Sequence, residues 1–102
     1  MLERGKKILV LSRAVQDTFT SSEWTEIGYL TGLDEWIDHH PRLLRSLNWG
    51  DPDYKGHAMD AVARILDQDP ANLKILVEYE PIVKWLKNHE PGALSELQAE
   101  VS

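Results

Sequence analysis

The residues that could do chemistry begin with four histidines, which serve in other proteins as metal ligands and proton carriers. His39 and His40 are adjacent, so on a helix their side chains point about 100° apart and one zinc ion cannot easily bind both. His57 and His89 lie far apart in the sequence, and no His-x-x-x-His spacing occurs. Positive charge on His39 and His40 would suit the end of a helix. We therefore expect no metal site and no cofactor.

The remaining candidates for catalysis lack their usual context. A calcium loop needs five or more oxygens, a fixed Gly and a terminal Glu, and Asp51-Pro52-Asp53 is not followed by that full set. Helix capping explains this pair, and likewise Asp67 with Asp69. No serine lies in a Gly-x-Ser-x-Gly turn, there is no cysteine, and the chain has no glycine-rich phosphate loop. The sequence thus predicts a protein that is not an enzyme.

Charged and aromatic residues indicate binding instead of catalysis. Arg42 and Arg45 are three residues apart, so on one short helix they would share a face and form a positive patch. Asp60 and Asp67 are seven residues apart on the longest expected helix, where they would form a negative stripe. Exposed charges of this kind often serve only as a solvated face. In a small domain without catalytic residues, however, they are also the best candidates for contacts with a partner.

Two aromatic residues near these charges are further candidate contacts. Trp49 is one of four tryptophans and lies in the turn Asn48-Trp49-Gly50-Asp51-Pro52-Asp53, the strongest turn cluster of the chain. A tryptophan in such a loop either covers the edge of the core or anchors a partner. Tyr54 follows directly. We expect Trp24 and Trp36 to lie in the core, and Trp85 to be buried or half-exposed.

Length and composition define what must position these residues. The chain has 102 residues, of which 42% are hydrophobic, so one domain with its own core is expected. The net charge of −6 argues against tight binding to a phosphate backbone. This charge is uneven, with −1 in residues 1–50 and −5 in residues 51–102. No apolar run is long enough to span a bilayer, and we expect a cytoplasmic protein that binds no membrane.

Prolines and capping residues divide the chain into short helices. Residues 7–19 are compatible with a strand or a helix, and helix is favoured because no second strand is available for pairing. We expect an all-α bundle of six or seven short helices. Residues 1–92 would form a single domain and residues 93–102 a weak terminal helix or a linker. The other expected helices span about 21–32, 34–40, 41–47, 53–68, 70–79 and 80–90.

The segment from His40 to Tyr54, HPRLLRSLNWGDPDY, resembles a segment of small helical domains attached to effectors of bacterial conflict systems. These include death-like and CARD-like modules. The resemblance covers residues 22–88 by layout and residues 40–54 by motif. It implies a six-helix bundle that associates with domains of the same fold. Such association would recruit a protease, nuclease or pore-former during antiphage defence or programmed cell death.

The resulting hypothesis is a non-catalytic interaction module that binds other protein domains through charged helix faces. Arg42 and Arg45 would form the positive side, Asp60 and Asp67 the negative side, and Trp49 and Tyr54 aromatic contacts. The alternative is a helix-turn-helix DNA-binding domain, whose recognition helix would be residues 41–47. A third hypothesis is a ligand carrier or small enzyme that uses His57 or His39 in an internal pocket.

Overall fold

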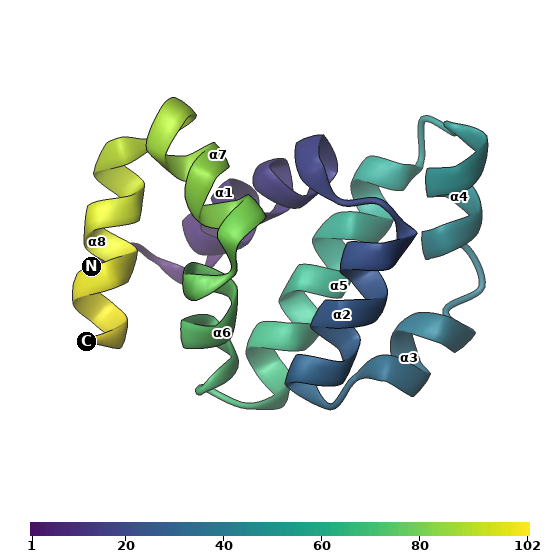
Figure 1. Ribbon diagram of the computed structural model, residues 1–102, viewed down its shortest axis with the longest axis horizontal. Helices are drawn as coiled ribbons and strands as arrows, with labels where there is room; N and C mark the ends of the chain where they lie inside the picture. Colours follow the sequence, from purple (N-terminus) through teal and green to yellow (C-terminus); the bar gives the residue numbers. More distant parts are fainter.

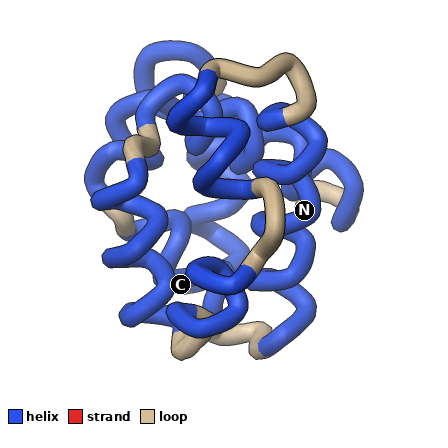
Figure 2. Tube along the Cα trace, turned by 90° about the vertical axis from the view of Figure 1, so that its right-hand side faces the viewer, coloured by secondary structure: helices blue, strands red, loops and turns tan.

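The computed structural model describes residues 1–102 and consists of helices and connecting loops, without a strand (Figures 1 and 2). The all-α prediction is confirmed, but there are eight helices instead of six or seven. The count rises because each short segment between prolines and glycines forms a separate helix and the terminal segment is fully helical. The helices are α1 (Arg4–Thr18), α2 (Ser21–Thr31), α3 (Asp34–His39), α4 (Leu43–Trp49), α5 (Tyr54–Gln68), α6 (Asn72–Glu78), α7 (Glu80–His89) and α8 (Pro91–Val101).

The helix boundaries follow local capping, although the capping residues differ in part from those expected. The N-cap of α2 is Thr20, which forms a reciprocal capping box with Glu23, so the cap lies one residue before the expected Ser21. Gly32 ends α2 with a φ of 74°, because glycine adopts this left-handed conformation without strain. Pro41 does not begin α4, which starts two residues later at Leu43.

The core lies where α1 packs against α5 and α7. The choice of helix for the first segment is confirmed, with Leu11 and Val15 fully buried. The expected stripe of α5 is also buried at Ala58, Val62 and Ile65. The 23 buried hydrophobic residues form one continuous cluster, as expected for one domain with its own core.

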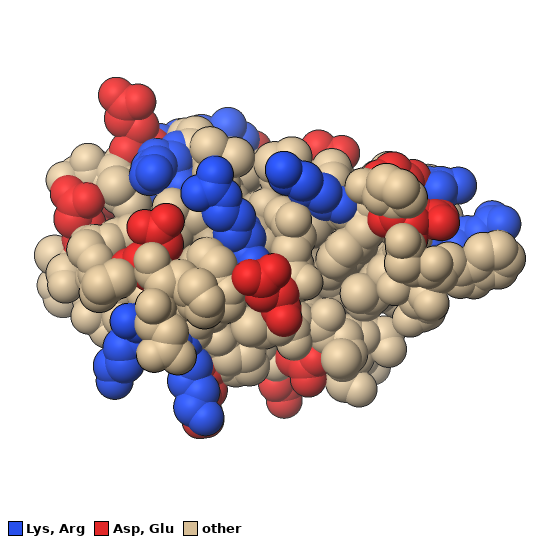
Figure 3. Space-filling view, turned by 90° about the horizontal axis from the view of Figure 1, so that it is seen from above, with Lys and Arg blue, Asp and Glu red and all other residues tan.

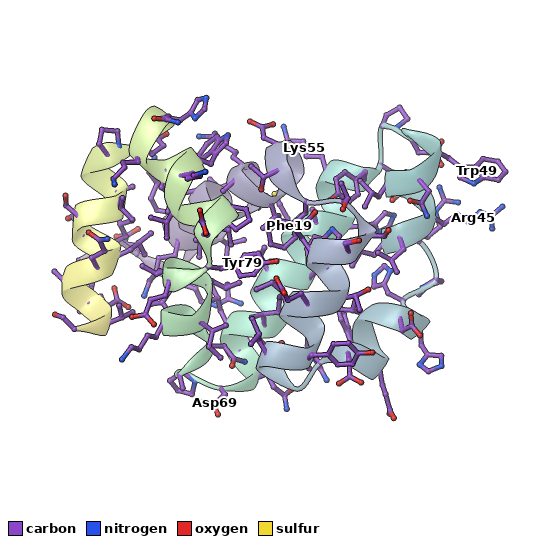
Figure 4. All side chains as sticks on the ribbon, viewed as in Figure 1. Phe19, Arg45, Trp49, Lys55, Asp69 and Tyr79 are labelled. Carbon is purple, nitrogen blue, oxygen red and sulfur yellow. The ribbon has the colours of Figure 1, made fainter.

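Aromatic side chains join α2 to the carboxyl-terminal half of the chain. Phe19 makes edge-to-face contacts with Trp24 at 5.1 Å and with Tyr79 at 5.5 Å between ring centroids. Figure 4 shows Phe19 and Tyr79 near the middle of the bundle. Trp85 is buried, and its indole nitrogen donates a hydrogen bond to Asp17 at 2.7 Å. Three of the four tryptophans, including the half-buried Trp36, thus have structural positions.

The terminal segment is part of the core. In α8, Leu94 and Leu97 are buried and pack with α6 and α7. The two ends of the chain lie beside α8 (Figure 1), where the amino group of Met1 is 3.4 Å from a carboxylate oxygen of Glu96. Residues 93–101 are therefore a packed helix and not a linker.

Candidate interaction surface

The most exposed aromatic side chain of the bundle is at the end of α4. Leu43 and Ser46 face the interior and are fully buried, so Arg45 and Trp49, four residues apart, face solvent. Gly50 has a φ of 67° and ends the helix directly after Trp49. The side chain of Trp49 is 72% exposed, and the Arg45 guanidinium lies 5.4 Å from the centre of its ring. We call Arg45 and Trp49 the α4 tip, which extends away from the bundle in Figure 4.

Trp49 therefore does not cover the edge of the core, which was one of the two interpretations of its place in the turn. Burying an aromatic side chain contributes substantially to stability, and this domain leaves most of the indole in water. Its stacked arginine partner covers part of the ring without removing it from the surface. The core-edge interpretation is therefore wrong, and the second interpretation, an anchor for a partner, stays a prediction.

Arg42 does not share a face with Arg45. It precedes α4, with a φ of −128°, and its guanidinium is 3.3 Å from a carboxylate oxygen of Asp51 and 2.7 Å from one of Asp53. Although burial would raise the pKa of Asp53, hydrogen bonds from His57 and Arg42 hold it below its ordinary value. The charge of Arg42 is thus compensated within the molecule, and the expected two-arginine patch is reduced to Arg45.

Figure 3 shows that positive and negative side chains also lie close together elsewhere on the surface. Basic and acidic side chains are interspersed on the face seen from above, and both signs meet at the end where α4 lies. No broad field of one sign is present on that face. The charge on this face therefore varies from place to place and forms no single-sign region.

Tyr54 has a structural role. It is half-buried, and its hydroxyl accepts a hydrogen bond of 2.9 Å from the indole nitrogen of Trp24. Burial raises the pKa of Tyr54, while the bond from Trp24 acts in the opposite direction. The expectation of a contact between Tyr54 and a partner is not supported by this position.

The two acidic residues proposed for the negative stripe differ in their surroundings. Asp67 binds Arg4 through two hydrogen bonds of 3.2 and 2.7 Å, so its charge is compensated. Asp60 is exposed on the same helix and raises the pKa of nearby His40, against the larger effects of burial and His57. The structure does not bring either residue to the α4 tip as a joint surface.

His40 is a residue whose role was not recognised from the sequence. Its ring nitrogen Nδ1 accepts hydrogen bonds from the backbone N–H groups of Arg42 at 3.1 Å and Leu43 at 2.9 Å. His40, two residues before the N-cap residue Arg42, therefore accepts two backbone N–H groups at the start of α4. This requires an unprotonated Nδ1, and His40 does not place positive charge at the end of α3. Burial lowers the pKa of His40, and the neighbouring His57, with 5.3 Å between ring centroids, lowers it further. Its position just before Pro41, at the start of a helix, was the available signal.

A second exposed aromatic surface, also not predicted, lies between α2 and α3. Tyr29 is 71% exposed and lines a shallow pocket of about 100 Å³. The rest of its lining is mainly acidic and comes from α3. We call this the α2–α3 acidic pocket, and its lining residues are Thr25, Tyr29, Asp34, Glu35, Ile37 and Asp38.

No group of three or more His, Cys, Asp or Glu side chains is arranged to hold a metal ion. The largest cavity, about 260 Å³, is lined mainly by two ion pairs, Arg4 with Asp67 and Lys7 with Glu100. Neither His57 nor His39 lines a cavity. No helix is both long and apolar enough to cross a membrane.

The fold and surface define a small all-helical domain with an exposed basic-aromatic tip. The family model described as AbiJ N-terminal domain 5 matches residues 2–94, and the chain belongs to this family. The family name indicates a domain associated with abortive infection, a form of antiphage defence. No curated protein and no solved structure matches the chain significantly.

Proposed function

We propose that this domain is a non-catalytic protein–protein interaction module of antiphage defence that binds its partner through the α4 tip. It would act in the cytoplasm, where it would recruit or assemble an effector. Held close together in this way, effector domains would reach a high effective concentration.

The observation that carries the proposal is the exposure of Trp49 beside Arg45. Tryptophan and arginine are the residue types most enriched among those that dominate binding energy at protein interfaces. Arg45 has no carboxylate partner in the molecule, and the indole of Trp49 is mostly in water. Both groups are therefore available to a partner without breaking an ion pair, and the only contact between them is their own.

The resemblance of residues 40–54 to CARD-like domains supports the same mechanism, because those modules act by association. The α4 tip lies inside this segment. We propose a death-fold-like mode of assembly, although the bundle has two helices more than the six of that family. The family match supports the setting in antiphage defence.

We propose a protein and not a nucleic acid as the partner. The expected recognition helix for DNA begins at Leu43 instead of Pro41, and Arg42 is paired with Asp51 and Asp53. Only Arg45 would then face the phosphates, far fewer cations than duplex binding requires. No observation favours the helix-turn-helix alternative.

Crosslinking from position 49 in phage-challenged cells tests the proposal. A photoreactive benzoylphenylalanine replaces Trp49, and in the control it replaces Leu9, which is 42% exposed on α1. The proposal predicts a discrete protein adduct from position 49 only, and its loss when Arg45→Glu is added. Absence of an adduct, or equal adducts from both positions, would refute the α4 tip as a binding surface.

A further inference from the structure

Two surfaces of this molecule expose an aromatic ring beside charge of one sign, and the two signs are opposite. At the α4 tip the ring is Trp49 and the charge is that of Arg45. At the α2–α3 acidic pocket the ring is Tyr29, and the carboxylates belong to α3. The side chains of Trp49 and Tyr29 have nearly equal exposure, 72% and 71%.

The carboxylates of the α2–α3 acidic pocket have no internal partners. Asp34, Glu35 and Asp38 form neither ion pairs nor side-chain hydrogen bonds, unlike Asp51, which is paired with Arg42. The first turn of α3 favours the charges of Asp34 and Glu35, but no cationic side chain pairs with any of the three carboxylates. An external cation would relieve their mutual repulsion.

Close packing of the backbone holds the pocket in shape. Gly28 lies against α3, and a Cβ atom at this position would come within 2.9 Å of the Cα of Asp34. The lack of a side chain at Gly28 thus lets the two helices approach closely. Ile37 is buried beneath the carboxylates and anchors α3 to the core. The site is therefore preorganised, which lowers the entropic cost of binding.

We propose that a second copy of this chain occupies the pocket, with the α4 tip of one copy bound to the α2–α3 acidic pocket of the next. The inference rests on the proposed function and names the partner of the α4 tip as a second copy of this chain. A pocket of about 100 Å³ suits the planar guanidinium of Arg45, which can bind carboxylates in a bidentate manner. The indole of Trp49, too large for the pocket, lies against Tyr29 at its rim.

The two surfaces differ, so this contact is head-to-tail. Contacts between two different patches form rings or open chains of copies, in contrast to the closed dimers of self-complementary patches. Within one molecule the two surfaces are not paired, since Arg45 forms no ion pair with a carboxylate of the pocket. Each copy thus keeps one free tip and one free pocket for its neighbours.

A charge-swap experiment with the purified chain tests the contact. Sedimentation velocity at low salt should show a mass that rises with protein concentration and falls when salt is added. Two variants should each weaken association on the order of tenfold or more, because like charges would face each other. They are the single variant Arg45→Glu and the double variant Glu35→Lys with Asp38→Lys. An equimolar mixture of the two variants should associate again, since the mixed contacts pair opposite charges.

Matched controls separate a specific contact from a change in net charge. Lys74→Glu matches the charge change of Arg45→Glu, and Glu3→Lys with Glu78→Lys matches that of the double variant. All three positions are exposed, and these controls should leave association unchanged. Circular dichroism and melting temperature establish that each variant is folded. A wild type that stays monomeric, a control that weakens association equally, or a mixture that does not associate would overturn the inference. If position 49 still crosslinks to a different protein, only the self-association fails and the proposed function stands.

Discussion

The start of α4 depends on two hydrogen bonds accepted by the side chain of His40. Replacing His40 by asparagine should keep an acceptor at this place but remove the group that can take up a proton. Nδ1 of His40 accepts the N–H groups of Arg42 and Leu43, and a proton on Nδ1 would abolish both bonds. Asparagine places a carbonyl oxygen near the position of Nδ1, is a favoured N-cap and does not titrate. His40→Asn should therefore keep α4 but lose its sensitivity to acid.

The sign of the effect follows from which state binds the proton more tightly. The pKa of His40 in the folded state is below the ordinary 6.5, chiefly because of burial. The unfolded chain therefore takes up a proton first, and the contribution of His40 to stability is complete above pH 6.5 and declines as the pH falls below it. From pH 7.5 to 5.5 the free energy of unfolding falls by at most about 1.4 kcal/mol through this group. This limit is the free energy of protonating one group of pKa 6.5 in the unfolded state.

Urea unfolding at pH 7.5, 6.5 and 5.5 measures this contribution. The wild type should lose more of its free energy of unfolding toward pH 5.5 than His40→Asn does, by up to about 1.4 kcal/mol. His40→Ala should be less stable at pH 7.5 by about 0.5–1.5 kcal/mol, the usual net contribution of an intramolecular hydrogen bond, because the N–H groups of Arg42 and Leu43 lose their acceptor. The reasoning is refuted if His40→Asn and the wild type show the same pH dependence.

Two further predictions concern stability. Arg42→Ala should lower the melting temperature by about 2–4 °C, because its ion pairs with Asp51 and Asp53 are lost. Arg45→Ala should change the melting temperature little, and equal shifts for the two variants would contradict the distinction between the two arginines. Gly28→Ala should destabilise the domain by roughly 1–3 kcal/mol despite the better helix propensity of alanine, because the new methyl group meets the backbone of Asp34. Gly56→Ala, whose methyl group would meet open space, is the matched control in the same urea titration and should be neutral or stabilising.

The helices could be predicted because the patterns that form them are local. Ala58, Val62 and Ile65 repeat at helical spacing, and the core indeed buries them. The terminal helix was underestimated because its stability comes from packing Leu94 and Leu97 against α6 and α7, which no local pattern reports.

The surface was harder to predict because the partner of each side chain is set by tertiary structure. Arg42 and Arg45 look equivalent in sequence, yet the backbone turn before α4 brings only Arg42 to Asp51 and Asp53. Tyr29 lies off the helix face that buries Trp24 and Ile27, and only the position of α3 shows that it lines a pocket. His40 was interpreted as a cation at the end of α3, whereas the following helix uses it as an acceptor.

Phage infection of cells that carry the protein in its native genetic setting tests the central claim most directly. The measurement is the plating efficiency of phage on Trp49→Ala, compared with Leu9→Ala as a matched loss of exposed apolar surface. If the α4 tip is the functional surface, Trp49→Ala restores plating while Leu9→Ala keeps the restriction of the wild type, at equal protein levels and melting temperatures. Restriction that is undiminished in Trp49→Ala would contradict the account.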